Sequence, residues 1–282
     1  MMEKRRYLFK LYYIGKSKYH GSQRQPNFLT IEDCLIDALL KKKYIENIKE
    51  SGFEFASRTD RYVSARGACF TCIMEKEPIL MEINSALPKE IGIWAYGKVP
   101  MHFLSRYNAV LRHYLYLVLK PYSYLQNYSS IDVEIMKKAC KILEGKHDFI
   151  NFSKREKLEV KSIRDMESAT LTVVNDYLLF QFKSQAFLRQ QVRRMVRKIL
   201  ELGLGEISFT DFNQLFDPTR EWSYQPVNAK GLILWNIDYS EEIRFIEDKK
   251  SKERMEAFFL KEKLSIEHKA QLFRLLQHND FC

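Results

Sequence analysis

The side chains best suited to catalysis lie in a short segment near residue 60. It places one carboxylate, Asp60, between two arginines, Arg58 and Arg61. Strand-like stretches at residues 53–56 and 68–74 flank the segment, so Asp60 is expected on the loop that connects them. Catalytic groups are often carried by loops on a rigid sheet. A surface ion pair between Asp60 and Arg58 is the structural alternative, and this segment alone leaves both interpretations open.

A second candidate is a predicted helix over residues 187–202 with a basic side. Arg189, Arg193 and Arg197 stand at positions i, i+4 and i+8 and would line one face of it. Apolar residues line the opposite face, which would pack on the core. A surface that binds a polyanion and a plain solvated face both fit this pattern.

Composition and charge restrict the class of protein. The chain has 282 residues, of which 46% are hydrophobic and 13% aromatic, enough for one large core or two ordinary domains. It has no long uncharged apolar run and no signal-peptide pattern, so we expect a soluble, cytoplasmic protein with no membrane partner. The formal net charge of +10 and the sequence pI near 9.2 indicate a polyanionic partner.

The five cysteines predict neither disulfides nor a metal. Their odd number in an intracellular-looking chain makes a disulfide framework an unsuitable explanation. Cys69 and Cys72 have CxxC spacing, but no second pair or suitably spaced histidine cluster completes a zinc site. In an extended strand these two side chains would point to opposite faces. We therefore expect no metal.

The elements that hold the Asp60 loop form a recognisable series. The hydrophobic pattern predicts a strand, a helix, two strands, a helix and a strand, in that order. This is the split βαβ pattern of a ferredoxin-like half. The expected elements are a strand at 7–13, a helix at 31–40, strands at 53–56 and 68–74, a helix from 79 stopped by Pro88, and a strand at 91–99.

A second series of the same kind follows. The expected elements are a strand at 112–119, a helix at 131–143, strands at 163–174 and 177–183, the helix at 187–202 and a strand at 231–237. Beyond residue 240 the chain predicts helices at 241–264 and 266–277 with a break near Ser265, packed by Phe245, Phe258, Phe259, Leu272, Leu275 and Leu276.

Together these elements predict an α+β fold. Two ferredoxin-like halves would form one continuous, mainly antiparallel sheet with a central catalytic cleft and helices on one face, plus a C-terminal helical extension. The N-terminal half, residues 1–105, would carry the Asp60 loop. The C-terminal half, 106–240, would carry a strand with Tyr114 and the basic helix, and 241–282 would be the extension.

Several sequence blocks in this order resemble the TruA family of tRNA pseudouridine synthases. The family's loop has Gly-Arg-Thr-Asp followed by Ala or Arg, Gly, Val and His or Ser, and the segment from Ser57 to Ser64 matches its core. The other matching blocks are Tyr13–Gln25, Asn84–Pro88, Phe103–Ala109 with Arg112–Tyr116, Ala186–Val196, and Ala229–Leu232. Several blocks are more specific than one motif. The resemblance runs from about residue 7 to 240 and leaves the last 40 or so residues without a counterpart in the family core.

The chain departs from the family pattern at three positions. Ser57 replaces the usual glycine, Ser22 replaces an aromatic residue, and Tyr62 stands where the family has a small residue. Small residues there would give the loop freedom in its backbone angles.

The resemblance implies a cofactor-free isomerisation of uridine to pseudouridine at tRNA positions 38, 39 and 40, by a homodimer. Asp60 would be the catalytic nucleophile or base, and Arg193, with Arg58, would keep it ionised. Tyr114 would stack on the uracil and remove the C5 proton, and Leu232 would pack on the other side. Arg58 would fill the space left by the flipped nucleotide.

The remaining basic residues would bind tRNA phosphates. They are Arg24, Arg61, Arg106, Arg112, Arg189, Arg194, Arg197 and Lys198. The alternatives are a family member acting at another tRNA position and a catalytically silent RNA-binding module. The joint presence of Arg58, Asp60, Tyr114 and Arg193 favours an enzyme.

Overall fold

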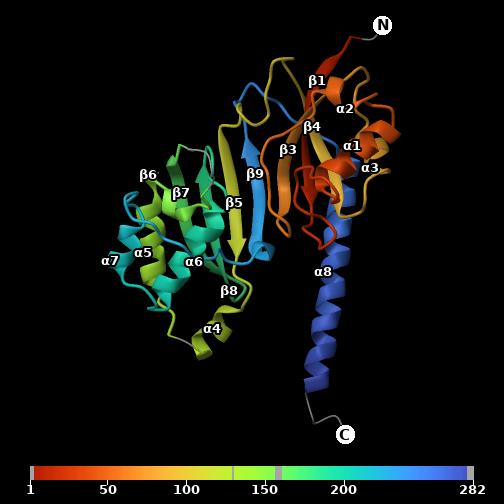
Figure 1. Ribbon diagram of the computed structural model, residues 1–282. Helices are drawn as coiled ribbons and strands as arrows, with labels where there is room; N and C mark the ends of the chain where they lie inside the picture. Colours follow the sequence, from red (N-terminus) through yellow and green to blue (C-terminus); the bar gives the residue numbers. More distant parts are fainter. Residues whose placement is uncertain (1–2, 129, 156–160, 278–282) are drawn as a thin grey trace.

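One large sheet organises the computed structural model, which describes residues 3–128, 130–155 and 161–277 (Figure 1). Its first half contains β1 (Arg5–Tyr13), α1 (Ile31–Lys41), α2 (Ile48–Ser51), β2 (Glu54–Phe55), β3 (Ser64–Met74), α3 (Leu80–Asn84) and β4 (Ile91–Val99). The second half begins with β5 (Leu111–Leu117), α4 (Tyr122–Tyr128), α5 (Val133–Leu143), β6 (Gly145–Asp148), η1 (Ile150–Phe152), β7 (Ile163–Val174) and β8 (Tyr177–Ser184). It ends with α6 (Gln191–Gly203), α7 (Phe209–Gln214), η2 (Ala229–Gly231) and β9 (Leu232–Asp238), and the chain continues with β10 (Ile246–Glu247) and α8 (Lys249–Gln277).

The strand order confirms the predicted fold class. The sheet runs β10-β4-β1-β3-β9-β5-β8-β7-β6, and β2 pairs with β3. The orders β4-β1-β3-β2 and β9-β5-β8-β7 are equivalent, so each half has the ferredoxin-like arrangement. β3 and β9 join the halves through a short parallel pairing, Ser64 with Ile233 and Ala65 with Leu234. The other pairs in the described residues are antiparallel. The domain boundaries near residues 105 and 240 stay a prediction.

The core lies between the sheet and the helices on its inner face. The Phe9 and Phe70 rings on neighbouring strands stack 4.8 Å apart, and Leu35 of α1 is fully buried with them. Helix α1 begins after Thr30 because Thr30 and Asp33 form a capping box. The predicted start of this helix is therefore confirmed, and the helix fixes the loop between β1 and α1 against the Asp60 loop.

The basic helix starts later than expected. α6 begins at Gln191, because Gln190 adopts a left-handed backbone conformation with φ of 61° that a helix cannot continue through. Arg189 therefore lies before the helix, and the prediction that it lines one helical face with Arg193 and Arg197 is wrong. The backbone before α6 instead turns Arg189 toward the central cavity.

The C-terminal extension is one helix and not two. α8 runs from Lys249 to Gln277 through Ser265, since serine costs a helix interior little and the segment has no glycine or proline. Asp248 starts it by accepting a hydrogen bond from the Ser251 N–H at 2.8 Å. The residues before it contain β10, which pairs with β4.

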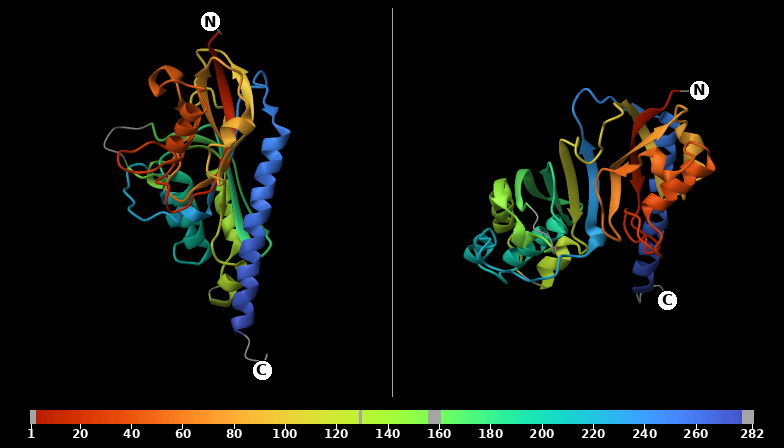
Figure 2. Two further views of the ribbon diagram at one scale, coloured as in Figure 1. Left: turned by 90° about the vertical axis from the view of Figure 1, so that its right-hand side faces the viewer. Right: turned by 45° about the horizontal axis from the view of Figure 1, so that its top comes forward.

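α8 packs on the side of the sheet opposite to α1, as Figure 2 (left) shows. Met255, Phe258 and Phe259 pack there in a cluster with Tyr12 and Trp94. The predicted packing of Phe258 and Phe259 is therefore confirmed. The last turns extend past the sheet with exposed apolar side chains. The predicted packing of Leu272, Leu275 and Leu276 is therefore wrong, since these side chains are about half or more exposed.

Candidate active site

Hydrogen bonds to the β1–α1 connection hold the loop that carries Asp60. The Ser22 N–H donates to the Thr59 carbonyl at 3.1 Å, and the Thr59 N–H donates to Ser22 Oγ at 2.8 Å. The Tyr13 hydroxyl lies 2.8 Å from Thr59 Oγ1. Ser22 is fully buried in this contact. Its hydroxyl therefore fixes the backbone next to the carboxylate.

Tyr62 occupies a backbone conformation that favours glycine. Its φ is +71°, in the left-handed region where a non-glycine residue is strained. A Cβ on Gly15 would meet the Tyr62 backbone at 2.3 Å, so the absence of a side chain at Gly15 permits this close approach. The Tyr62 ring lies under two cations, with Arg61 at 4.9 Å and Lys230 at 5.7 Å from its centroid. These contacts offset part of the strain.

Asp60 pairs with Arg193 across 133 residues of sequence. Arg193 Nη1 lies 2.7 Å from Asp60 Oδ2, and Arg193 Nε donates to the Val227 carbonyl at 2.8 Å. The Arg193 side chain is 12% exposed and that of Asp60 is 37% exposed. A nearly buried guanidinium thus holds a carboxylate that is still open to a ligand. The alternative in which Arg58 takes this pairing is wrong.

Tyr114 lies on β5 beside this ion pair. Its side chain is buried, the Phe187 ring meets it edge-on at 5.1 Å, and its hydroxyl lies 3.0 Å from Ser57 Oγ. Burial raises the pKa of the Tyr114 phenol, and the Asp60 charge raises it further, against the lowering effects of Ser57 and Arg112. The phenol therefore carries its proton at neutral pH.

These groups face one large basic cavity of about 1510 Å³ between the two halves. Asp60 is the only acidic residue among the described residues that line it. Nine arginines and lysines line it, namely Arg58, Arg61, Arg106, Arg112, Lys154, Arg155, Lys161, Arg164 and Arg189. A single carboxylate inside a strongly positive cavity is suited to a polyanionic substrate that carries its reacting group to Asp60.

The structure brings most of the predicted substrate-binding residues to this cavity. Arg58, Arg61, Arg106 and Arg189 are exposed on its lining. Leu232 also lines it, and Gly231 next to it has no room for a side chain, because a Cβ would meet the Leu117 carbonyl at 2.3 Å. The Gly-Leu sequence therefore sets the position of the Leu232 side chain at the cavity wall.

Arg112 has a structural role in place of the predicted phosphate contact. It is buried, and its guanidinium donates to the carbonyls of Ala56 at 3.0 Å, Arg106 at 2.7 Å and Gln185. Burial lowers its pKa. Because three of its five N–H donors are bound to carbonyls and the side chain is buried, Arg112 holds the backbone of the site and does not contact phosphates.

Four more predicted phosphate contacts lie outside the described cavity lining. Lys198 is buried and pairs with Glu201 at 2.7 Å, and Arg197 pairs with the same carboxylate at 2.5 Å. Arg194 lies over the Tyr224 ring, and Arg24 pairs with Asp33 at 3.1 Å. Intramolecular partners thus occupy these charges, which helical spacing alone does not reveal.

Sequence reasoning missed the basic residues contributed by the segment between η1 and β7 and by the start of β7. Lys154, Arg155 and Lys161 of the segment and Arg164 of β7 line the cavity. Arg155 also pairs with Glu221. The high density of basic residues between positions 154 and 164 was the signal in the sequence that could have identified them. Their position could not be read from it, because the segment has no periodic pattern that predicts an element.

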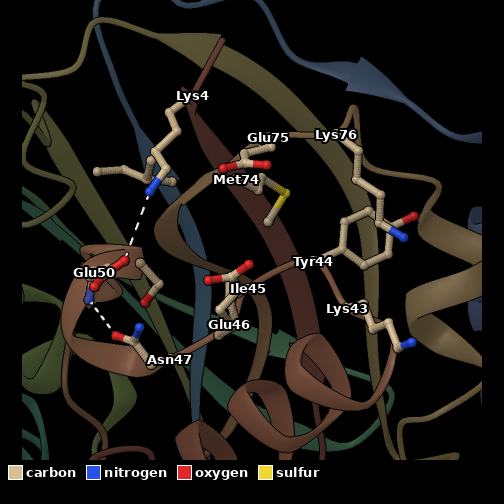
Figure 3. Close-up of a pocket in the computed structure, with 12 residues that line it drawn as sticks. Lys4, Lys43, Tyr44, Ile45, Glu46, Asn47, Glu50, Met74, Glu75 and Lys76 are labelled. Atoms are coloured by element: carbon tan, nitrogen blue, oxygen red, sulfur yellow. Dashed lines mark hydrogen bonds and ion pairs between the residues drawn. The ribbon is translucent and has the colours of Figure 1, made fainter. Parts of the chain in front are cut away.

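A second, smaller hollow carries no comparable signal. Figure 3 shows it beside β1 and the ends of α1 and β3, with a volume of about 240 Å³. Three lysines and three glutamates are mixed along its lining, and Lys4 pairs there with Glu50 at 3.8 Å. Mixed charge gives it no net attraction for a polyanion, so the large cavity is the candidate active site.

None of the four described cysteines lines the cavity. Cys69 and Cys72 are buried on β3, and burial raises the pKa of each thiol to about 12. The described residues contain no group of three or more metal-ligating side chains. In the same part of the chain, none of the helices combines the length and apolar character needed to cross a bilayer.

Comparisons with known proteins agree with this geometry. A family model described as tRNA pseudouridine synthase matches residues 139–240. A tRNA pseudouridine synthase A of Methanosphaera stadtmanae is 33% identical over 261 residues, which is 92% of each chain. Those of Methanothermobacter thermautotrophicus and Methanosarcina mazei are 34% and 35% identical, over 86% of this chain and 85% and 88% of their own.

The first of these alignments also reaches into the C-terminal extension. An alignment over 92% of 282 residues extends past residue 240, so this relative has a counterpart for part of the segment 241–282. Identity above 30% over most of both chains is by itself sufficient to show a common family. This chain belongs to the TruA family of tRNA pseudouridine synthases, which are isomerases that act on tRNA.

Proposed function

We propose that the chain isomerises uridine to pseudouridine in the tRNA anticodon stem-loop, at positions 38, 39 and 40, with Asp60 as its catalytic carboxylate. The observation that carries this proposal is the 2.7 Å ion pair between Asp60 and Arg193, in a cavity where Asp60 is the only acid among the described lining residues. The Arg193 guanidinium balances the charge of the Asp60 carboxylate and fixes its position, and nucleophilic and general-base roles both use a carboxylate placed in this way.

The reaction breaks the N1–C1′ glycosidic bond of uridine, turns the uracil over and joins C5 to C1′. Asp60 reacts in its ionised form, at the sugar or at the base ring. Tyr114 stacks on the uracil. Its phenol gives up its own proton, N1 of the released uracil gains one, and the phenolate then receives the C5 proton, so the reaction is neutral in protons and needs no external oxidant or group donor. Leu232 packs against the other side of the base, which its position on the cavity wall supports.

A paired or stacked uridine hides its reacting atoms, so the base must leave the helix before the reaction. Arg58 is exposed on the cavity lining, two residues from Asp60 in sequence. It fills the space that the extruded nucleotide leaves in the RNA. The other exposed arginines and lysines of the lining bind the flanking phosphates.

The anticodon arm is the proposed target because RNA recognition relies on shape and on single-stranded loops. The cavity is large enough to admit an extruded nucleotide with neighbouring phosphates, and its positive charge attracts the backbone. We also propose a homodimer, as the resemblance to the family implies, and the cytoplasm as its compartment.

Release of tritium from tRNA carrying 5-tritiated uridine tests the reaction, since C5 loses its hydrogen when it joins C1′. We expect the wild-type protein to release label, and Asp60→Ala to lower the rate by roughly a thousandfold or more. Asp60→Asn is the matched control, because it keeps the volume and removes the charge, and it should be equally inactive. Both variants should still bind tRNA.

The same assay separates the alternatives. A wild-type protein that binds tRNA but releases no label would be an RNA-binding module. For the target position, transcripts in which uridine 38, 39 or 40 is replaced one at a time should each lose one modified site. Unchanged label release from a transcript lacking all three would place the activity at another tRNA position.

A further inference from the structure

Ser57 stands at the start of the loop that carries Asp60 and is among the residues that line the cavity. Ser57 Oγ lies 3.0 Å from the Tyr114 hydroxyl oxygen, within hydrogen-bonding distance. A glycine at this position would leave the buried phenol without that contact.

The contact connects elements that are not neighbours in the sheet. β9 lies between β3 and β5, and Ser57 belongs to the loop before β3. Two side chains of β5 reach across to this loop: Arg112 donates to the Ala56 carbonyl at 3.0 Å, and Tyr114 contacts Ser57. The start of the Asp60 loop is therefore attached to β5 at two successive residues.

The groups around the Tyr114 phenol show why its contact with Ser57 matters. Phe187 covers the Tyr114 ring, and the charged or titratable groups that act on the phenol are Asp60, Arg112 and Tyr13. Among the described residues, Ser57 is the hydrogen-bond partner of the hydroxyl. A phenol hydroxyl rotates about its C–O bond, so its hydrogen bond sets the direction in which the lone pairs and the proton point.

We propose that Ser57 is a positioning residue for the isomerisation. Its hydroxyl donates to the Tyr114 oxygen and holds the phenolate, formed when Tyr114 gives up its own proton, where it receives the uracil C5 proton. This inference rests on the proposed function of Tyr114. Ser57 does not touch the uridine in this role. It acts on the reaction through the phenol, and it attaches the phenol to the same loop that carries Asp60.

Ser57→Ala tests the proposal in the tritium-release assay. We expect kcat to fall about fivefold, the size of effect that one ordinary side-chain hydrogen bond supports. The Kd for tRNA should stay unchanged. Because the Ser57 hydrogen bond lowers the pKa of the phenol, its removal should shift the kcat limb that reports phenol ionisation to higher pH.

Two further variants separate positioning from a general effect on the loop. Ser57→Thr keeps a hydroxyl and should restore both kcat and the pH profile. Ser64→Ala removes a hydroxyl from the other end of the loop, where Ser64 Oγ accepts from the Gly15 N–H at 3.1 Å. It should change thermal stability and leave the pH profile in place.

The outcomes are distinct. A wild-type protein that releases no label removes the proposed function itself, whatever the serine does. If the wild type is active and Ser57→Ala keeps its kcat and pH profile, only the role of Ser57 is overturned. A fall in kcat that Ser57→Thr fails to restore, with an unshifted pH profile, also overturns it, because the serine would then serve only the loop conformation.

Discussion

Arg193 connects three parts of the molecule through one planar group. Its guanidinium contacts Asp60 and the Val227 carbonyl, while the backbone carbonyl of the same residue accepts from the Val227 N–H at 3.2 Å. Arginine can hold two acceptors in a fixed geometry, whereas a lysine ammonium is a point charge on a flexible stem. The residue type is therefore as important as the charge.

Arg193→Lys should lower kcat for tritium release by about ten- to a hundredfold, the range expected for a hydrogen bond to a charged group. The positive charge remains, but the geometry at Asp60 is lost. Arg220→Met is a suitable control, because Arg220 is an exposed arginine paired with Asp217 at 3.5 Å, away from the site. Wild-type activity in Arg193→Lys would show that charge alone is sufficient.

Tyr62 gives a stability prediction with an unusual sign. At most positions alanine is more stable than glycine, but the φ of +71° reverses this preference. We expect Tyr62→Gly to unfold at higher urea than Tyr62→Ala, with a difference of about 1 kcal/mol in unfolding free energy. Both variants lack the ring, so their comparison isolates the backbone. Equal stability would mean that the loop relaxes out of this conformation.

At the scale of elements, the hydrophobic pattern predicted most strands and helices and their order. The strand at 91–99 and the start of α1 after Thr30 are confirmed. Local signals were sufficient there, namely alternation and a capping box. They were insufficient where one backbone angle decides the outcome, as at Gln190, which delays α6 to Gln191.

The candidate site was likewise only partly predictable from local sequence patterns. Asp60, Tyr114 and Arg193 lie far apart in sequence, and only the resemblance to a family predicted that they act together. Arg112 and Lys198 were misassigned because their partners, three carbonyls and Glu201, are set by tertiary packing. Spacing along a helix or strand reports which residues share a face, but not what that face contacts.

α8 has two parts with different expected effects on stability. Met255→Ala should lower the unfolding free energy by about 2 kcal/mol, since it removes a buried side chain from the cluster with Tyr12 and Trp94. Removal of residues 265–282 should leave the melting temperature nearly unchanged, because the described side chains there are exposed. Thermal unfolding measures both. A clear loss of stability on truncation would mean that another chain covers the last turns of α8.

At the scale of the whole molecule, the cavity draws its charge from both halves. Arg58 and Arg61 come from the first half, and Lys154, Arg155 and Lys161 come from the second. The RNA backbone would therefore contact both sides of the sheet junction. Binding should weaken as salt rises, because phosphate neutralisation releases counterions.

Lys154→Gln should weaken tRNA binding and reduce the slope of log Kd against log salt by about one. Lys137→Gln is the matched control, since Lys137 pairs with Glu134 on α5 at 2.7 Å and does not line the cavity. A titration at several salt concentrations measures both slopes. The same slope in the two variants would exclude Lys154 as a phosphate contact.

The short parallel pairing of β3 with β9 has a consequence for biosynthesis. β9 lies between β3 of the first half and β5 of the second half, yet it is the last of the central strands to be made. At about 5 to 20 residues per second, the ribosome completes β9 roughly 10 to 30 seconds after β3. Until then β3 and β5 each lack the strand that lies between them, and Asp60 and Arg193 have no joined sheet to bring them together. The nascent chain therefore has unpaired strand edges and no active site until β9 inserts between β3 and β5.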